Sequence, residues 1–421
     1  MPGERALLVT VQLDPRFEPS RIIWPIEDEA AELRELASAA GCRVVGEVTA
    51  RRHTPVAGTF LGEGKLEEIA EQVDSVQAQT VIFSQELSPA QQRNIEERLR
   101  AKTIDRTQLI LDIFAQRARS QEGKVQVELA QLRYLLPRLM GKGIMLSRLG
   151  GGIGTRGPGE QKLEMDRRRI RQRLSRLGDE LEKLGRRRQA MRARRKETEV
   201  PVAALLGYTN AGKTTLLNRL TGAAATARNQ LFTTLDPLAR RLRLPSGDWV
   251  VVTDTVGFLH HLPHHLIDAF HATLEEARDA DLLLHVLDAS HPLALEQAGA
   301  VEEVLASLEL QEKPLLTILN KRDRLENPAR LAALEQAYKP AVTISAKTGE
   351  GLETLLERLS EQLGLRLIEP TTLLLPAERP DLVAAVYQGG HVLRRREVDG
   401  RIELTARLPG KLRTKLSAYL S

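Results

Sequence analysis

The stretch Gly207-Tyr-Thr-Asn-Ala-Gly-Lys-Thr214 matches the phosphate-binding loop pattern G-x-x-x-x-G-K-[ST] in full. An apolar run of strand length, residues 201–206, precedes it, and residues 215–220 follow with helical spacing. In such a turn, backbone N–H groups and a helix N-terminus surround the phosphates. The sequence therefore predicts a nucleoside triphosphate site, with Lys213 on the outer phosphates and Thr214 on magnesium.

A second motif follows another apolar run, residues 249–254, and reads Asp254-Thr-Val-Gly257. In this D-x-x-G arrangement, an aspartate at a strand end lies near the magnesium ion, and a glycine N–H can respond to the γ-phosphate. We therefore expect a switch at this position.

The third and fourth motifs predict which base is bound. Residues 315–319 form a buried strand that leads into Asn320-Lys-Arg-Asp323, where one carboxylate can accept both the ring N–H and the exocyclic amine of guanine. Adenine presents no such donor pair, so guanine is expected. Residues 341–344 then lead to Ser345-Ala-Lys347, whose backbone can close on the other edge of the base.

Length and composition limit the class of protein. A chain of 421 residues is expected to form two to four domains. We find no segment typical of a signal peptide or a transmembrane helix. The single cysteine, Cys42, excludes an internal disulfide framework and favours a reducing compartment. These observations predict a cytoplasmic protein.

The N-terminal 107 residues alternate strand-like and helical apolar runs, which predicts a small α/β domain with a mainly parallel sheet. Within it, Gly62-Glu-Gly-Lys65 resembles a phosphate loop weakly, but the spacing differs and no Ser or Thr follows the lysine. We interpret it as a turn that starts a helix, with a second nucleotide site as the alternative.

Residues 108–199 are expected to form a helical hairpin. Apolar residues recur at spacings of four and three from Val125 to Leu139, and every seven residues from Leu163 to Met191. The glycine-rich segment 141–159 between them is predicted to be a long loop. Its Arg148 and Arg156 favour a polyanionic partner.

The second helix of this hairpin is strongly basic. Residues 162–199 carry 15 Lys or Arg against 7 Asp or Glu, whereas the whole chain has a net charge of only +5. This asymmetry favours nucleic acid as a partner, although a solvated helix would have the same composition.

Taken together, the motifs resemble the translation-factor-related class of GTPases. The closer resemblance is to the HflX family of ribosome-associated GTPases. It rests on the glycine-rich run 151–160 with the adjacent 163–164 and 166–168, on the Tyr-Thr-Asn phosphate loop, and on Leu231-Phe-Thr-Thr-Leu-Asp-Pro237. It covers residues from about 6 to 364, and the C-terminal tail more loosely.

The resemblance implies a two-part N-terminal region that binds the large (50S) ribosomal subunit and its rRNA, and a role in splitting or rescuing stalled ribosomes. It also implies that Thr234 is the switch threonine that meets magnesium in the GTP state. Asn210 resembles a potassium ligand of related cation-activated GTPases. Where many GTPases carry a water-orienting glutamine, this chain has Phe258, so slow intrinsic hydrolysis is expected unless ribosomes or potassium stimulate it.

The chain departs from the family pattern in the second switch, where His260 and His265 stand at positions that more often carry arginine and aspartate. Together with His261, His264 and His271 they form a histidine-rich segment. Metal ligation and exposed or RNA-facing imidazoles remain the alternatives for it.

The candidate site residues fall into four groups. The catalytic group is Asn210, Lys213, Thr234 and Gly257. The nucleotide-binding group is Gly207, Tyr208, Thr209, Asn210, Ala211, Gly212, Lys213, Thr214, Thr215, Phe232, Thr233, Thr234, Leu235, Asp236, Asp254, Thr255, Val256, Gly257, Asn320, Lys321, Arg322, Asp323, Ser345, Ala346 and Lys347. The magnesium group is Thr214 and Thr234 directly, and Asp254 through water. The RNA-binding group is Arg148, Arg156, Arg167, Arg168 and Arg169.

The predicted architecture is an α/β multidomain protein. It comprises an N-terminal α/β domain (1–107), a helical hairpin (108–199), a P-loop GTPase domain with a mixed, mainly parallel sheet (200–364) and a small C-terminal α/β domain (365–421). We expect a monomer that binds GTP and GDP with Mg²⁺. The alternatives to ribosome splitting or rescue are a GTP-switched RNA-binding checkpoint in ribosome assembly or RNA modification, and ATP-dependent RNA remodelling by the N-terminal domain.

Overall fold

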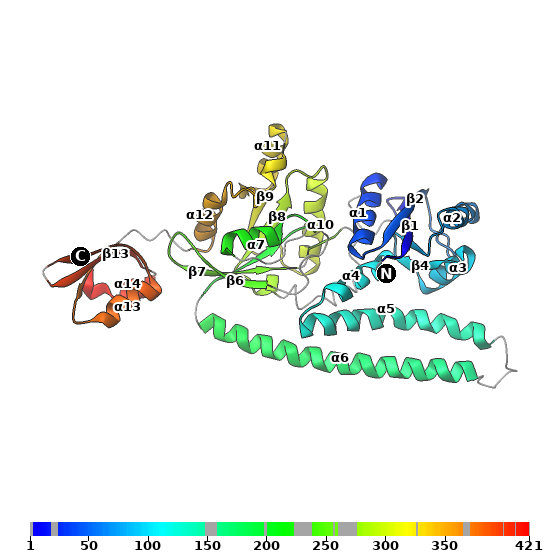
Figure 1. The fold of residues 1–421 in the computed structure, drawn as a ribbon, viewed down its shortest axis with the longest axis horizontal. Helices are drawn as coiled ribbons and strands as arrows, with labels where there is room; N and C mark the ends of the chain where they lie inside the picture. Colours follow the sequence, from blue (N-terminus) through cyan, green and yellow to red (C-terminus); the bar gives the residue numbers. More distant parts are fainter. Residues whose placement is uncertain are drawn as a thin grey trace.

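A computed structural model of the chain describes residues 3–17, 24–147, 158–197, 200–222, 238–255, 257–259, 276–325, 327–364, 371–398, 400–408 and 410–420. The N-terminal and C-terminal α/β units lie at opposite ends of the molecule, with the GTPase domain between them (Figure 1). The predicted α/β multidomain fold is confirmed. Among the described residues, no helix is both long enough and apolar enough to span a bilayer.

The N-terminal domain is a parallel sheet in the order β2-β1-β3-β4. Its helices are N-capped where the sequence provides an acceptor: Ser88 forms a capping box with Gln91, and the side chain of Asp105 accepts from the backbone N–H of Gln108. The elements are β1 (Arg5–Leu13), α1 (Ile26–Ala39), β2 (Arg43–Arg52), α2 (Glu63–Ser75), β3 (Thr80–Phe83), α3 (Pro89–Leu99), β4 (Lys102–Asp105) and α4 (Arg106–Arg117).

Two long helices, α5 (Gln121–Ser147) and α6 (Pro158–Glu197), form the predicted hairpin. Val125 and Leu129 of α5 pack against Leu177 of α6, which is fully buried. The expected loop 141–159 is shorter than we predicted, because α5 continues to Ser147 and α6 begins at Pro158. Glycines lower helix stability by only about 1 kcal/mol each, so Gly141 and Gly143 did not end the helix.

The GTPase domain contains a sheet in the order β10-β9-β8-β5-β7-β6, in which only β6 is antiparallel to its described neighbour. All seven residues of β8 are buried, as expected for a central strand covered on both faces. The elements are β5 (Val202–Leu206), α7 (Lys213–Thr221), β6 (Leu238–Arg243), β7 (Trp249–Asp254), β8 (Leu282–Asp288), α10 (Ala294–Ser307), β9 (Leu315–Asn320), α11 (Pro328–Ala337), β10 (Ala341–Thr343) and α12 (Leu352–Gln362).

The C-terminal domain is an antiparallel sheet in the order β11-β13-β12, with its own apolar cluster. Arg243 at the end of β6 donates from Nη2 to the Gly390 carbonyl at 2.5 Å and joins this domain to the GTPase domain. The elements are β11 (Thr371–Pro376), α13 (Pro380–Gly389), β12 (His391–Val398), β13 (Arg401–Arg407) and α14 (Gly410–Lys415).

Candidate nucleotide-binding site

The phosphate loop joins β5 to α7, at the edge of the sheet where the parallel strands end. Its first and last glycines are required by sterics. Gly207 has φ 147°, and a Cβ there would lie 2.2 Å from the Val286 carbonyl oxygen. Gly212 has φ 99°, and a Cβ there would lie 2.3 Å from Asn320 Nδ2. Side chains at these positions would therefore force the loop away from the neighbouring strand ends.

Lys213 lies inside the loop and is almost fully buried. Its Nζ donates to the carbonyl oxygens of Gly207 at 3.0 Å and Tyr208 at 2.8 Å. Burial lowers the pKa of Lys213 to about 8, and the nearby Asp254 carboxylate partly opposes that shift. An anionic ligand stabilises the charged form of a buried ammonium group that donates to neutral carbonyls, and phosphates would provide that negative charge.

The oxygen ligands that magnesium prefers are present beside the lysine. Thr214 Oγ1 donates to Asp254 Oδ2 at 2.7 Å, and both residues are buried. The Thr209 hydroxyl is also buried, with no hydrogen-bond partner among the described residues. The residues present therefore fit a phosphate-bound magnesium ion.

Gly257 closes on the phosphate loop from the end of β7. A Cβ at Gly257 would lie 2.8 Å from Thr209 Cγ2 and 3.0 Å from Lys213 Nζ. The next residue pairs with the loop, because the Thr209 N–H donates to the Phe258 carbonyl at 2.8 Å. The Phe258 side chain lies in an apolar cluster of the domain and is 3% exposed. It therefore points into the core of the domain.

The guanine motifs are tied to the phosphate loop by Asn320 at the end of β9. Its Nδ2 donates to the Ala211 carbonyl at 2.8 Å, and its Oδ1 accepts from the Ala346 N–H at 2.9 Å. Asp323 Oδ1 accepts from the Ser345 hydroxyl at 2.7 Å. These contacts bring residues 320–323 and 345–347 together at the same edge as the phosphate loop.

An open groove of about 570 Å³ lies between the phosphate-loop helix and the second guanine motif. Six residues line it: Thr215, Asn218, Arg219, Gly222, Ala346 and Lys347. Three of them, Thr215, Ala346 and Lys347, were predicted to contact the nucleotide.

Some predicted residues lie outside the described part of the chain. These are Phe232, Thr233, Thr234, Leu235, Asp236 and Val256 in the switches, the histidine-rich segment from His260 to His271, and Arg148 and Arg156 in the hairpin loop. On α6, Arg168 is exposed, and Arg169 is 78% exposed at 3.8 Å from Asp166. Arg167 is only partly exposed.

Sequence reasoning missed two contributions to this site. The carboxylate of Asp288, at the end of β8, binds Lys321 Nζ at 2.6 Å. Asp288 ends an apolar run, as Asp254 does, so the same pattern could have identified it. The second contribution is helix α1, whose Glu32 accepts a hydrogen bond from the Tyr208 hydroxyl of the phosphate loop. No local pattern predicts this contact, because 176 residues separate the two side chains.

Comparisons with known proteins agree with this geometry. Four family models match in order: "GTP-binding GTPase N-terminal" over residues 27–115, "GTP-binding GTPase Middle Region" over 117–195, "50S ribosome-binding GTPase" over 202–321 and "HflX C-terminal domain" over 331–420. The chain is 46% identical over 417 residues to GTPase HflX of Caldanaerobacter subterraneus subsp. tengcongensis, covering 99% of this chain and 94% of that protein.

GTPase HflX of Escherichia coli K12 is 44% identical over 409 residues, which are 97% of this chain and 94% of that protein. A solved GTP-binding protein from Sulfolobus solfataricus, in complex with GDP, aligns at 25% identity with a TM-score of 0.44, over 86% of this chain and 99% of that one. The sequence matches cover nearly the whole chain and include every motif of the site. The resemblance found in the sequence is thus confirmed, and the chain belongs to the HflX family of GTPases, which hydrolyse GTP.

Proposed function

We propose that this GTPase binds the large (50S) ribosomal subunit in its GTP form and couples GTP hydrolysis to the splitting or rescue of stalled ribosomes. The match of residues 202–321 to the 50S ribosome-binding GTPase family carries the proposal. The long basic helix α6 supports it, since each phosphate that a Lys or Arg contacts releases counterions. A protein with this role works in the cytoplasm, and we propose that it acts as a monomer.

We propose the following roles for the residues of the site. Residues 207–215 surround the phosphates, and Lys213 neutralises the outer ones. Thr214 and, in the GTP state, Thr234 bind Mg²⁺, while Asp254 holds a water of that ion. Gly257 offers its N–H to the γ-phosphate. Residues 320–323 and 345–347 bind guanine, and residues 232–236 with 255–256 complete the nucleotide contacts.

We further propose that intrinsic hydrolysis is slow and is stimulated by ribosomes or by potassium. The buried Phe258 side chain cannot orient the attacking water as a glutamine would. The transition state therefore has to be stabilised in another way, for which a positive charge is one means. Asn210 has φ 61° in the phosphate loop, and its match to the potassium ligand of related GTPases supports the potassium role. Turnover should be faster in potassium than in sodium for the wild type. Asn210→Ala should remove this difference, and equal wild-type rates in both salts would contradict the potassium role.

The proposed RNA contacts are the arginines of the hairpin, namely Arg148, Arg156, Arg167, Arg168 and Arg169. Arg168 and Arg169 can be tested most directly, because both are exposed on α6. Replacing this pair with glutamine should weaken ribosome binding and make it less dependent on salt. A slope against the logarithm of salt concentration that stays unchanged would argue against these contacts.

The decisive experiment is co-sedimentation with 30S, 50S and 70S particles in GTP, GDP and a non-hydrolysable GTP analogue, followed by an assay of subunit separation. We expect GTP-dependent binding to 50S and 70S particles, and separation of 70S particles. Binding to 50S particles without separation would instead favour the checkpoint role in assembly. Failure to bind any particle in any nucleotide state would contradict both.

A further inference from the structure

The N-terminal domain contacts the phosphate loop through a buried tyrosine. Tyr208, the second residue of the loop, is 3% exposed and packs with its ring centroid 5.7 Å from that of Trp24. Its hydroxyl donates to one carboxylate oxygen of Glu32 in α1. In Figure 1, α1 is the N-terminal helix that faces the GTPase domain. A loop that binds phosphates is therefore fastened to a different domain.

The carboxylate that receives this hydrogen bond is itself held in place. The other oxygen of Glu32 accepts from Nη2 of Arg106, at the start of α4, and the side chains of both residues are 8% exposed. Although burial alone would favour the neutral guanidine, the carboxylates of Glu32 and Glu29 raise the pKa of Arg106. Arg106 is thus charged and has a partner in Glu32. The Tyr208 hydroxyl satisfies the second oxygen of Glu32, which is buried as well.

The backbone of the same tyrosine belongs to the phosphate site. Its carbonyl accepts from Lys213 Nζ at 2.8 Å. On either side of it, the Thr209 N–H donates to the Phe258 carbonyl at 2.8 Å and the Gly207 carbonyl accepts from the Phe258 N–H at 3.1 Å. Movement of the Tyr208 ring would therefore move a ligand of the loop lysine.

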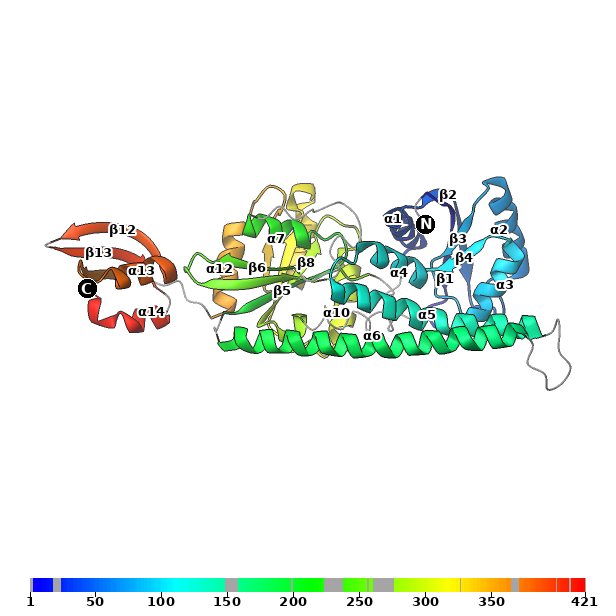
Figure 2. The same cartoon turned by 60° about the horizontal axis from the view of Figure 1, so that its bottom comes forward.

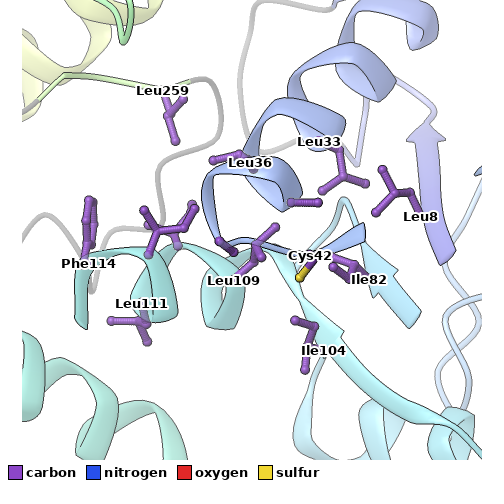
Figure 3. Packing of buried hydrophobic residues seen from close by; sticks show 14 of the residues in the cluster. Leu8, Leu33, Leu36, Cys42, Ile82, Ile104, Leu109, Leu111, Phe114 and Leu259 are labelled. Carbon is purple, nitrogen blue, oxygen red and sulfur yellow. The ribbon is translucent and has the colours of Figure 1, made fainter. Parts of the chain in front are cut away.

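A second contact ties the D-x-x-G segment to the same domain. Leu259, two residues after Gly257, is 2% exposed and belongs to one apolar cluster with Leu36 of α1 and Phe114 of α4. Figure 3 shows Leu259 on the GTPase side of this cluster, close to Leu36. The N-terminal domain thus packs on both segments that meet the phosphates.

We propose that Tyr208 is a positioning residue of the phosphate loop, anchored by Glu32 and Arg106, so that nucleotide affinity depends on the docked N-terminal domain. This inference rests on the proposed assignment of residues 207–214 as the phosphate site. The anchor stabilises the conformation of the phosphate loop that binds both GTP and GDP. By reciprocity, a bound nucleotide also strengthens docking of the N-terminal domain.

The first test measures GTP and GDP affinity of the full chain by competition with a fluorescent GDP analogue. Tyr208→Phe removes only the hydroxyl, and Glu32→Gln removes the charge that compensates Arg106. Each should weaken GTP and GDP by a similar factor, on the order of tenfold. The double variant should lose no more affinity than the single variant with the larger loss, since both changes break one chain of contacts. Tyr387→Phe and Glu27→Gln, at exposed positions, are the matched controls.

A second readout separates positioning from general destabilisation. In the wild type, added GDP should slow hydrogen exchange of the α1 backbone, and Tyr208→Phe should remove that protection while the nucleotide-free exchange of β1 stays unchanged. Wild-type affinity in both variants, additive losses, or no protection of α1 by GDP would overturn the proposal. Lys213→Ala distinguishes the two levels of inference: if it too binds normally, the phosphate-site assignment is wrong, whereas if it alone loses binding, only the role of Tyr208 is wrong.

Discussion

Asp323 is the residue on which base specificity should depend. Its Oδ1 already accepts from the Ser345 hydroxyl, which orients the carboxylate beside the segment 345–347. We expect Asp323→Asn to lose GTP and to gain xanthosine triphosphate, whose ring edge reverses the hydrogen-bond pattern. Each unpaired buried polar group costs about 1–3 kcal/mol. Titration with both nucleotides checks this, with Asp74→Asn on the surface of α2 as the control.

Retained GTP affinity in the Asp323→Asn variant would mean that the base is recognised elsewhere. An equal loss of both nucleotides would mean instead that the substitution disturbs the loop. Only an exchange of preference supports the pairing.

His285 should make the stability of the protein depend on pH. It lies in β8, is 1% exposed, and has its ring edge-on to Tyr338 at 6.3 Å. Burial, and then the charge of Lys213, lower the pKa of His285 to about 4. The unfolded chain therefore binds a proton more readily, so the stabilisation is complete above about pH 6.5 and is lost as the pH falls toward 4, at up to about 1.4 kcal/mol per pH unit.

Urea unfolding at pH 6.5, 5.5 and 4.5 would measure this dependence, with His285→Leu as the comparison. Other titrating groups affect both proteins equally, so the difference between them isolates the imidazole. We expect the variant to lose less stability on acidification. Parallel losses in the two proteins would argue against a neutral buried histidine.

The residues of the motifs could be predicted because their roles depend on short spacings. Gly207, Gly212 and Lys213 share one turn, and sterics in that turn determine which residues are allowed. Glu32 and Arg106 could not be predicted, because their positions depend on how two domains pack. Asp288 lies between these cases: its strand was recognisable, but its contact with Lys321 depends on the order of strands in the sheet.

At the scale of elements, the hairpin depends on a narrow apolar seam. Leu177 is fully buried between α5 and α6, and Leu174 and Leu181 flank it. Leu177→Ala should destabilise the pairing of the helices by about 2–5 kcal/mol, through lost burial and a residual cavity. Hydrogen exchange should then accelerate along α5 and α6, while the sheet of the GTPase domain remains protected. Met165→Ala, at a position 56% exposed, is the matched control.

Several strands of the GTPase domain could be predicted because each has a continuous apolar run. Strands β5, β7 and β9 are examples, since both faces of a mainly parallel sheet are covered. Strand β8 has a similar run but was not predicted. Strand β6 was not predicted either, since it is an edge strand in which Arg240, Arg241 and Arg243 are exposed and only Leu242 is buried. Helix α4 was not predicted, because its N-cap at Asp105 is clear only once β4 is recognised. Pairing with β7, rather than a local pattern, decides the structure of β6.

At the scale of the whole molecule, α6 links the far end of the protein to the nucleotide site. The helix has 40 residues and is therefore about 60 Å long. It runs along the N-terminal and GTPase domains in Figure 2, and ends at Glu197, shortly before β5 begins at Val202. Since β5 leads directly into the phosphate loop, the outer end of the hairpin is covalently connected to the nucleotide site through α6 and β5 alone.

This arrangement gives the sharpest test of what the hairpin loop does. Replacing residues 148–157 with a short Gly-Ser turn should leave GTP affinity unchanged, because no described contact joins this end of the hairpin to the nucleotide site. Ribosome-stimulated hydrolysis and subunit separation should both be lost if the loop is the part that enters the RNA. A variant that keeps the full length of the loop but has Arg148 and Arg156 changed to glutamine separates the effect of loop charge from the effect of loop length. If the shortened protein binds ribosomes and separates subunits as the wild type does, the loop is only a connection, and α6 transmits nothing from it to the phosphate loop.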